Sequence, residues 1–297
     1  MTDTTLAPAA AAAADAPTSK RRRATSFPWL TVPAVAFYLL FFGWPLAQMM
    51  WRSIWDGGFT LTGYHEFFTQ PVYWWVLGYT MVIGVVTLVL TLAIGYPVAY
   101  WLVRLDRTWT VVLMAFVLIP FWSSGLVRTY AWIVILGRQG LVNNALLGMG
   151  LIDRPFPFLG THTAVMVGLT YYLLPYMILC LFSVMNNIDR NLMLAARNLG
   201  ASPVRAFVEV FVPLTKPGVF AGSFLVFMLA IGMYITPALL GGPEQTTLPL
   251  VIALQINEAL DWTLAAALSM ILLAVTIVIQ LFANRHVDLD RMWGGAR

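Results

Sequence analysis

Charged residues are scarce in this chain: they make up 10% of its 297 residues, whereas hydrophobic residues make up 60%. A soluble domain usually has about 25% charged residues, and a soluble fold of this size could not keep so much apolar surface from water. Where no water satisfies the backbone polar groups, the chain must cross the bilayer as closed helices. The composition therefore predicts an all-α integral membrane protein.

Residues for covalent or metal chemistry are equally few. Cys180 is the only cysteine, which excludes disulfides and thiolate metal sites. The histidines, His65, His162 and His286, stand in no metal-binding spacing such as HExxH, and no paired carboxylates fall within a hydrophobic run. The chain also lacks a GxxxxGK[ST] phosphate loop. We therefore expect no enzyme activity, no catalytic residue and no metal or cofactor in this chain, and any ATP must be bound by another subunit.

Hydrophobic runs are the dominant feature that is present. Helices of roughly 20 residues cross about 30 Å of hydrocarbon, and six runs are long enough: 30–50, 72–103, 109–136, 163–185, 217–240 and 262–283. The second and third exceed one span, so we expect tilting, a kink at Pro97 or Pro120, or extension beyond the membrane. Pro175 is expected to interrupt the fourth run, and stretch 232–237 the fifth; such breaks either line a cavity or serve helix packing.

Basic residues are unevenly distributed between the two sides that these runs define. With the N-terminus inside, 13 of the 17 basic residues lie on the inner side; the other 4, outside, are Arg52, Arg128, Arg138 and Arg154. The positive-inside rule then predicts that both termini and the loop at 191–216 are cytoplasmic.

The expected organisation follows from these runs. Residues 1–28 are expected to form a disordered Ala-rich tail with a basic topology anchor at 20–23, and not a cleavable signal peptide. Residues 29–71 hold the first span and an outer loop, residues 72–284 the transmembrane core, and residues 285–297 a cytoplasmic tail.

The segment at 191–222 combines several positive charges with a helix–turn–helix pattern. Apolar residues at helical spacing give its first helix one apolar face: Leu192, Ala195, Ala196 and Leu199. Gly200 suits a left-handed helix end, Ser202 a cap and Pro203 a first helical residue. Pro213 and Pro217 are expected to end the second helix. From physics alone the unit either transmits force to a soluble partner or lies on the lipid surface.

The same segment resembles the EAA loop of ABC-importer permeases, which reads E-A-A, three residues, Gly, then about a dozen residues to a hydrophobic–Pro pair. Ala195, Ala196, Gly200 and Pro213 fall on that pattern, whereas Leu194 stands in the position of the Glu. Four further stretches resemble the spermidine/putrescine branch of these permeases: SSGLVRTYAW (123–132), VPLTKPGVFAG (212–222), PALLGG (237–242) and DWTLAAA (261–267).

The resemblance implies a type I (MetI-like) transmembrane domain with six transmembrane helices and a cytoplasmic coupling helix, in a bacterial inner membrane. It implies a second homologous permease, two ATP-binding cassette subunits that hold ATP and Mg²⁺, and a periplasmic substrate-binding protein. Partners are thus proteins and the lipid bilayer, with no nucleic acid. The residues it places in ATPase coupling are Ala195, Ala196, Arg197, Gly200, Ala201, Arg205 and Pro213. Leu194 suggests that the partner permease supplies the stronger acidic contact.

The cargo implied by this branch is a small organic cation such as spermidine or putrescine. Organic cations bind between carboxylates and aromatic rings, with about 0.5–2 kcal/mol from each cation–π contact. Candidate pathway residues are Trp122, Tyr130, Trp132, Tyr171, Tyr172, Tyr234, Glu258, Asp261 and Trp262. The pair Asp261–Trp262, an acid beside an indole at a span mouth, is the one we favour. Lipid anchoring or helix packing is the alternative role for every aromatic residue in this set.

Two other functions stay open at this point. A permease of the same fold could carry an opine, an amino-acid-derived solute or an aminophosphonate. An ion-coupled carrier is disfavoured because acidic residues near the bilayer midplane are missing; Glu258 and Asp261, at the mouth of the last run, come closest. A stand-alone channel is the remaining alternative.

Overall fold

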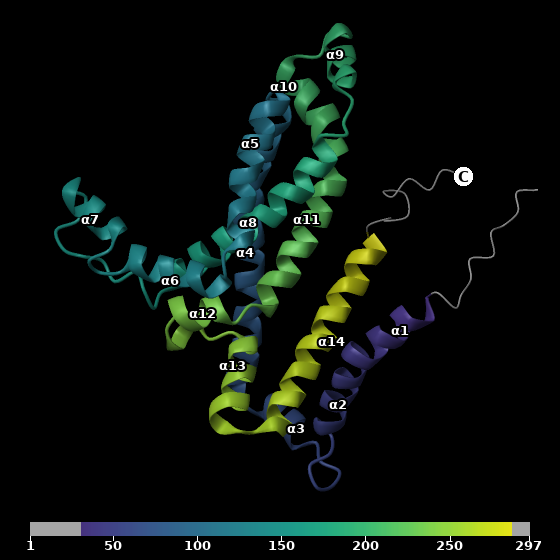
Figure 1. Ribbon diagram of the computed structural model, residues 1–297, viewed down its shortest axis with the longest axis vertical. Helices are drawn as coiled ribbons and strands as arrows, with labels where there is room; N and C mark the ends of the chain where they lie inside the picture. The colour runs from purple at the N-terminus through teal and green to yellow at the C-terminus, as the bar shows by residue number, and fades with distance from the viewer. Residues whose placement is uncertain (1–30, 287–297) are drawn as a thin grey trace, which may run out of the picture. The chain divides into compact units, whose positions relative to one another are not determined.

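The computed structural model describes residues 31–286, which are almost entirely helical (Figure 1). The expected tail at 1–28 and nearly all of the expected tail at 285–297 lie outside this range. The chain divides into two units, Met1–Ala47 and Gln48–Arg297. Near the boundary, α1 (Val32–Tyr38), the π-helical turn η2 (Leu39–Gly43) and α2 (Trp44–Arg52) follow one another without a break, and together they are long and apolar enough to cross a membrane.

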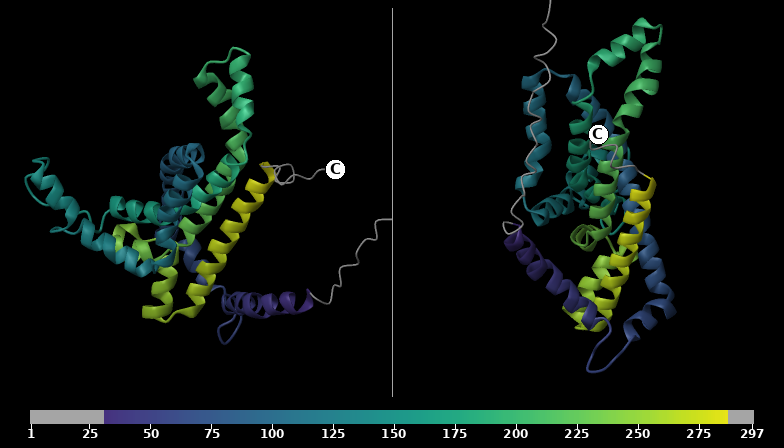
Figure 2. Two further views of the ribbon diagram at one scale, coloured as in Figure 1. Left: turned by 45° about the horizontal axis from the view of Figure 1, so that its top comes forward. Right: turned by 90° about the vertical axis from the view of Figure 1, so that its right-hand side faces the viewer.

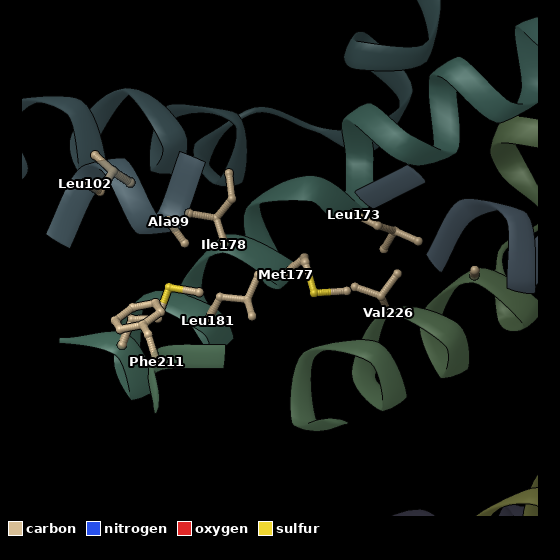
Figure 3. Packing of buried hydrophobic residues seen from close by; sticks show 10 residues of the cluster. Ala99, Leu102, Leu173, Met177, Ile178, Leu181, Phe211 and Val226 are labelled. Atoms are coloured by element: carbon tan, nitrogen blue, oxygen red, sulfur yellow. The ribbon is translucent and has the colours of Figure 1, made fainter. Parts of the chain in front are cut away.

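Three long helices form the centre of the second unit: α4 (Pro71–Arg104), α8 (His162–Met185) and α11 (Val212–Gly232) pack against one another. Leu173, Met177 and Leu181 on α8 are fully buried against Leu102 of α4 and Val226 of α11 (Figure 3). Small residues allow the close approach, because a side chain at Gly95 or Gly218 would collide with α8.

The remaining helices extend this centre. They are α3 (Thr62–Thr69), α5 (Arg107–Leu118), η3 (Ile119–Trp122), α6 (Gly125–Leu136), α7 (Leu141–Gly148), α9 (Arg190–Asn198), α10 (Pro203–Ala206), η4 (Phe207–Phe211), α12 (Ile235–Leu240), η5 (Pro243–Gln245), α13 (Leu248–Leu254), η6 (Gln255–Ala259) and α14 (Trp262–His286). Helix α14 packs on α3 and α13 around the buried Phe67, Leu248 and Leu268. The α9–α10 loop projects from the ends of α8 and α11 (Figures 1 and 2).

The described residues contain five helices long and apolar enough to span a membrane, or six if one bent pair counts as a span. The bent pair corrects the expectation for run 109–136, which is not one helix: the segments 107–122 and 125–148 meet at 99°. Pro120 lacks an amide hydrogen, and Ser123 and Ser124 adopt extended ψ angles of 143° and 141°. The helix therefore breaks at the serines, three residues beyond the expected kink.

Three other expectations about proline are wrong. Pro175 does not interrupt the fourth span, because α8 continues through it. Pro213 and Pro217 do not end the second helix of the 191–222 segment, since α10, η4 and α11 form one helix from Pro203 to Gly232. Neighbouring helices and Thr hydroxyls can accommodate a proline in a membrane helix. Between Pro213 and Pro217, the Thr215 hydroxyl donates to the Val212 carbonyl at 2.8 Å.

A buried asparagine ties the loop around α7 together. The side chain of Asn143 is fully buried; its Nδ2 donates to the carbonyls of Gly137 and Phe156 at 3.0 Å, and its Oδ1 accepts from the Phe156 amide at 2.8 Å. Asn143→Ala should destabilise the protein by about 2–4 kcal/mol, since each bond contributes about 1 kcal/mol and the groups left behind stay buried. Thermal unfolding in detergent measures this.

The adjacent residue provides the matched control. Asn144 is exposed and makes one side-chain bond, to the Gln139 carbonyl at 3.1 Å. Asn144→Ala should change stability by less than about 1 kcal/mol. Equal losses in the two variants would contradict the structural role of Asn143.

Candidate functional site

The projecting loop has the helix–turn–helix geometry that its sequence predicts. The Asp189 carboxylate caps α9 by accepting from the Asn191 amide at 2.9 Å. Gly200 follows the helix with φ at +92°, the left-handed conformation that favours glycine. The Ser202 hydroxyl then accepts from the Arg205 amide at 3.3 Å, and Pro203 is the first residue of α10. These features confirm the expected cap, turn and proline.

The apolar residues of this loop are left uncovered by the described part of the chain. Leu199 is 90% exposed, Val204 72% and Leu192 44%. A monomeric soluble surface rarely carries such a patch, whereas a protein-interaction surface does. Ala195 and Ala201 add small side chains to the same loop. The loop therefore presents an apolar, close-approach surface at the tip of the second unit.

This loop is continuous with one of the membrane helices. Because α10 continues into α11, any displacement of the turn at Gly200 acts directly on a helix that packs on α4 and α8. The hydroxyls of Tyr96 on α4 and Thr215 lie 3.0 Å apart and hydrogen-bond across the helix pair. Pro213 lies within this continuous helix. Sequence reasoning missed this continuity because proline was expected to end the helix.

The basic residues of the loop have different environments. Arg205 forms an ion pair with Glu209 at 2.9 Å, but both side chains are more than half exposed, so the pair contributes at most about 1 kcal/mol. Arg197 forms no ion pair within residues 31–286. Its position near Leu194 places it on a cavity of about 640 Å³ between the loop and the ends of α4 and α8.

The predicted pathway residues lie on several different elements. Trp132 and Tyr171 meet edge to face, with ring centroids 5.5 Å apart, across α6 and α8. Trp122 is 81% exposed at the end of η3, and Tyr130 is 58% exposed on α6. Glu258 lies exposed in η6. Their roles in a pathway stay predictions.

Two of the predicted rings already contact arginines of this chain. The Arg128 guanidinium lies 4.1 Å from the Tyr172 ring centroid, and that of Arg52 lies 5.3 Å from the Trp262 centroid. Asp261, the acid of the favoured pair, caps α14 by accepting from the Leu264 amide at 2.9 Å. A cargo ammonium would therefore have to compete with a resident guanidinium at both rings.

The break expected near the end of the fifth run is confirmed. Helix α11 ends at Gly232, Met233 is extended, and α12 begins at Ile235. Tyr234, 45% exposed, lies at this break. A break of this kind can line a cavity or serve helix packing.

A polar network that links α4, α8 and η5 was not predicted from the sequence. The His162 ring, at the start of α8, lies 3.1 Å from the Tyr79 hydroxyl through Nδ1 and 3.3 Å from the Gln245 amide nitrogen through Nε2. The Gln245 Oε1 in turn accepts from the Gly242 amide at 2.8 Å. These residues are far apart in sequence, so only their folded positions reveal the network linking α4, α8 and η5.

Comparison with known proteins agrees with this architecture. Residues 91–288 match the family described as "Binding-protein-dependent transport system inner membrane component". The chain belongs to this family of ABC-importer permeases. It is 36% identical over 242 residues to the spermidine/putrescine transport system permease protein PotB of Escherichia coli (strain K12), covering 78% of this chain and 86% of that protein. The PotB protein of Haemophilus influenzae is 35% identical over 238 residues, covering 78% and 83%.

Solved importers share the fold of this permease. A bacterial ABC transporter that imports the acidic polysaccharide alginate matches with a TM-score of 0.71 at 16% identity, over 87% of this chain and 93% of that chain. The MetNI methionine transporter in an inward-facing conformation matches with a TM-score of 0.55 at 18% identity, over 73% and 96%. The type I, MetI-like fold expected from the sequence is confirmed, and the permease is a multi-pass inner-membrane protein.

Proposed function

We propose that this permease moves spermidine, putrescine or a similar small organic cation across the inner membrane. The observation that supports this choice of cargo is the 36% identity to the PotB permease over 78% of the chain. Of the solved transporters that share the fold, one imports alginate and the other is a methionine transporter, so the fold itself leaves the cargo open. An amino-acid-derived solute, an opine or an aminophosphonate is the second candidate, because the same fold serves different cargoes.

The proposed assembly follows that of an ABC importer. This permease pairs with a second, homologous permease, two ATPase subunits that bind ATP and Mg²⁺, and a periplasmic binding protein. Both termini and the α9–α10 loop face the cytoplasm, in keeping with the 13 of 17 basic residues assigned to that side. Support for an ATPase contact comes from the uncovered apolar tip, where Leu199 is 90% exposed.

In the proposed mechanism, ATP closes the ATPase dimer and displaces the loop seated in a groove of one ATPase. Ala195, Ala196 and Ala201 allow close approach, and Gly200 provides the turn. Because α10, η4 and α11 form one continuous helix from Pro203 to Gly232, the displacement is passed along this helix to the break at Tyr234. Cargo released by the binding protein enters the outward-open cavity, and hydrolysis restores the inward-facing state.

Co-expression tests this function. The permease, its partner permease and the ATPase encoded with them should co-purify, and the complex reconstituted in lipid should hydrolyse ATP. We expect strong stimulation by spermidine or putrescine in the presence of the binding protein, and none in its absence. Stimulation by another solute alone would keep the importer and reject the polyamine cargo. Failure to co-purify with any ATPase would reject the coupling role of the loop.

A further inference from the structure

The cavity beside the α9–α10 loop combines an aromatic wall with a cationic side. Its volume is about 640 Å³, and its walls come from the ends of α4 and α8 and from α9, α10 and η4. The apolar wall is aromatic. The ring centroid of Tyr100 lies 5.0 Å from the ring centroids of Phe207 and Phe211, and the Phe207 and Phe211 rings stack with their centroids 5.6 Å apart. Such a wall suits hydrocarbon.

The polar side of the cavity is cationic. Arg104 and Arg197 both line it, and neither forms an ion pair within residues 31–286. Arg104 is held in place because its guanidinium lies 4.1 Å from the Tyr100 ring centroid. Asp189 is the one acidic residue of the lining, and its carboxylate caps α9. Two positive charges and one negative charge leave a net charge of +1, so the cavity attracts an anion.

The cavity lies at the end of a membrane-spanning helix, where lipid headgroups are found. Arg104 is the last residue of the α4 span. Trp101 and Trp109, on α4 and α5 at the same end, are 55% and 60% exposed. Exposed tryptophans near the ends of spans mark the membrane–water interface. An anion that reaches this cavity from the bilayer therefore brings acyl chains with it.

We propose that this cavity binds an anionic phospholipid, with the headgroup phosphate between Arg104 and Arg197 and an acyl chain against Tyr100, Phe207 and Phe211. Basic pockets between transmembrane helices bind anionic headgroups in this way. The proposal needs neither the cargo nor the ATPase contact; only the assignment to the cytoplasmic leaflet depends on the proposed orientation. It also gives Leu194 a role, because a glutamate in this position of the lining would repel the phosphate.

The lipid would act on the part of the protein that transmits force. It would join the end of α4 to α9 and η4, so its presence would stiffen the loop against the membrane helices. We therefore expect transport by the complex to depend on anionic lipid, with phosphatidylglycerol supporting more uptake than phosphatidylcholine.

Native mass spectrometry of the purified complex, exchanged into mixed phosphatidylglycerol and phosphatidylcholine, tests the site. Wild type should retain phosphatidylglycerol selectively, and Arg104→Gln should lower that retention at least about fivefold, as expected for the loss of one charged hydrogen-bonding partner. Arg107→Gln is the matched control, since Arg107 is exposed at the start of α5 and lies outside the cavity lining. Leu194→Glu, at an exposed position, should also lower retention and does not depend on removing an arginine.

Several results would overturn the proposal. Equal retention in wild type and Arg104→Gln, or equal losses in Arg104→Gln and Arg107→Gln, would remove the site. If phosphatidylcholine were retained as well as phosphatidylglycerol, the site would not select an anionic headgroup. If inorganic phosphate displaced the lipid, the cavity would bind a free anion. If Arg104→Gln released the ATPase subunits but kept the lipid, the arginine would belong to a protein contact.

Discussion

Gly200→Val should lower uptake by about tenfold while the protein still inserts and assembles. Gly200 has φ at +92°, and an added Cβ would meet no atom within 4 Å, so the substitution acts through backbone conformation alone. The left-handed region costs an L-residue about 1–2 kcal/mol, and a β-branched side chain suits it least. A cost of this size changes the population of the turn by roughly 5–30-fold. Since α10 and α11 are one helix, a rebuilt turn would alter the alignment of the loop with the ATPase.

Uptake and ATP hydrolysis measured together in proteoliposomes check this expectation. We expect the amount of cargo moved for each ATP hydrolysed to fall, which distinguishes lost coupling from lost protein. Gly150→Val is the matched control: Gly150 has φ at +69° and equally open surroundings, but lies in the loop after α7. It should keep near-normal uptake. Normal uptake by Gly200→Val would refute the coupling role, and equal losses in both variants would indicate general strain.

Gly218→Leu should prevent stable packing of α11 on α8. A Cβ at this position would lie 3.0 Å from the Val184 Cβ and 3.2 Å from the Cys180 carbonyl oxygen. The carbonyl belongs to the helix backbone and cannot move aside as a flexible side chain would. Overpacking typically costs about 1–3 kcal/mol, and a leucine adds three carbons beyond the Cβ. We expect the midpoint of thermal unfolding to fall by about 5–10 °C, or the folded protein to be lost.

Size-exclusion chromatography after heating in detergent measures this effect. Gly78→Leu is the control, because Gly78 lies in another spanning helix, α4, and an added Cβ there would meet no atom within 4 Å. It should leave the midpoint within about 2 °C. Gly218→Ala should fall between these two variants. If Gly218→Leu unfolded at the wild-type temperature, the close packing of α11 on α8 would be wrong.

Local patterns in the sequence were enough for much of the coupling loop. The Asp189 cap was not predicted. Gly200 permits the left-handed turn because it lacks a Cβ, Ser202 provides a cap and Pro203 fixes its own φ, and all three take the expected role. The spans at 72–103, 163–185 and 262–283 were likewise predictable to within about three residues, because long apolar stretches have one stable form in lipid.

Proline was the least reliable guide. Its missing amide hydrogen is a local fact, but its consequence depends on what surrounds the freed carbonyl. Three residues after Pro120 the chain bends by 99°, whereas at Pro175 and Pro217 the helices continue. Pro175 and Pro217 lie in helices that pack together with α4. This tertiary support cannot be predicted from the residues next to each proline in the sequence.

By itself, the sequence determined the membrane-spanning class, the family pattern and the turn of the coupling loop, because each depends on residues close together in the chain. Tertiary structure alone decided which side chains meet: Arg128 with Tyr172, Tyr79 with His162 and Gln245, and Arg104 with the aromatic wall of the cavity. Contacts such as Tyr79–His162 and Tyr96–Thr215 join residues 83 and 119 positions apart. They form only when helix packing brings distant segments together, which no local pattern encodes.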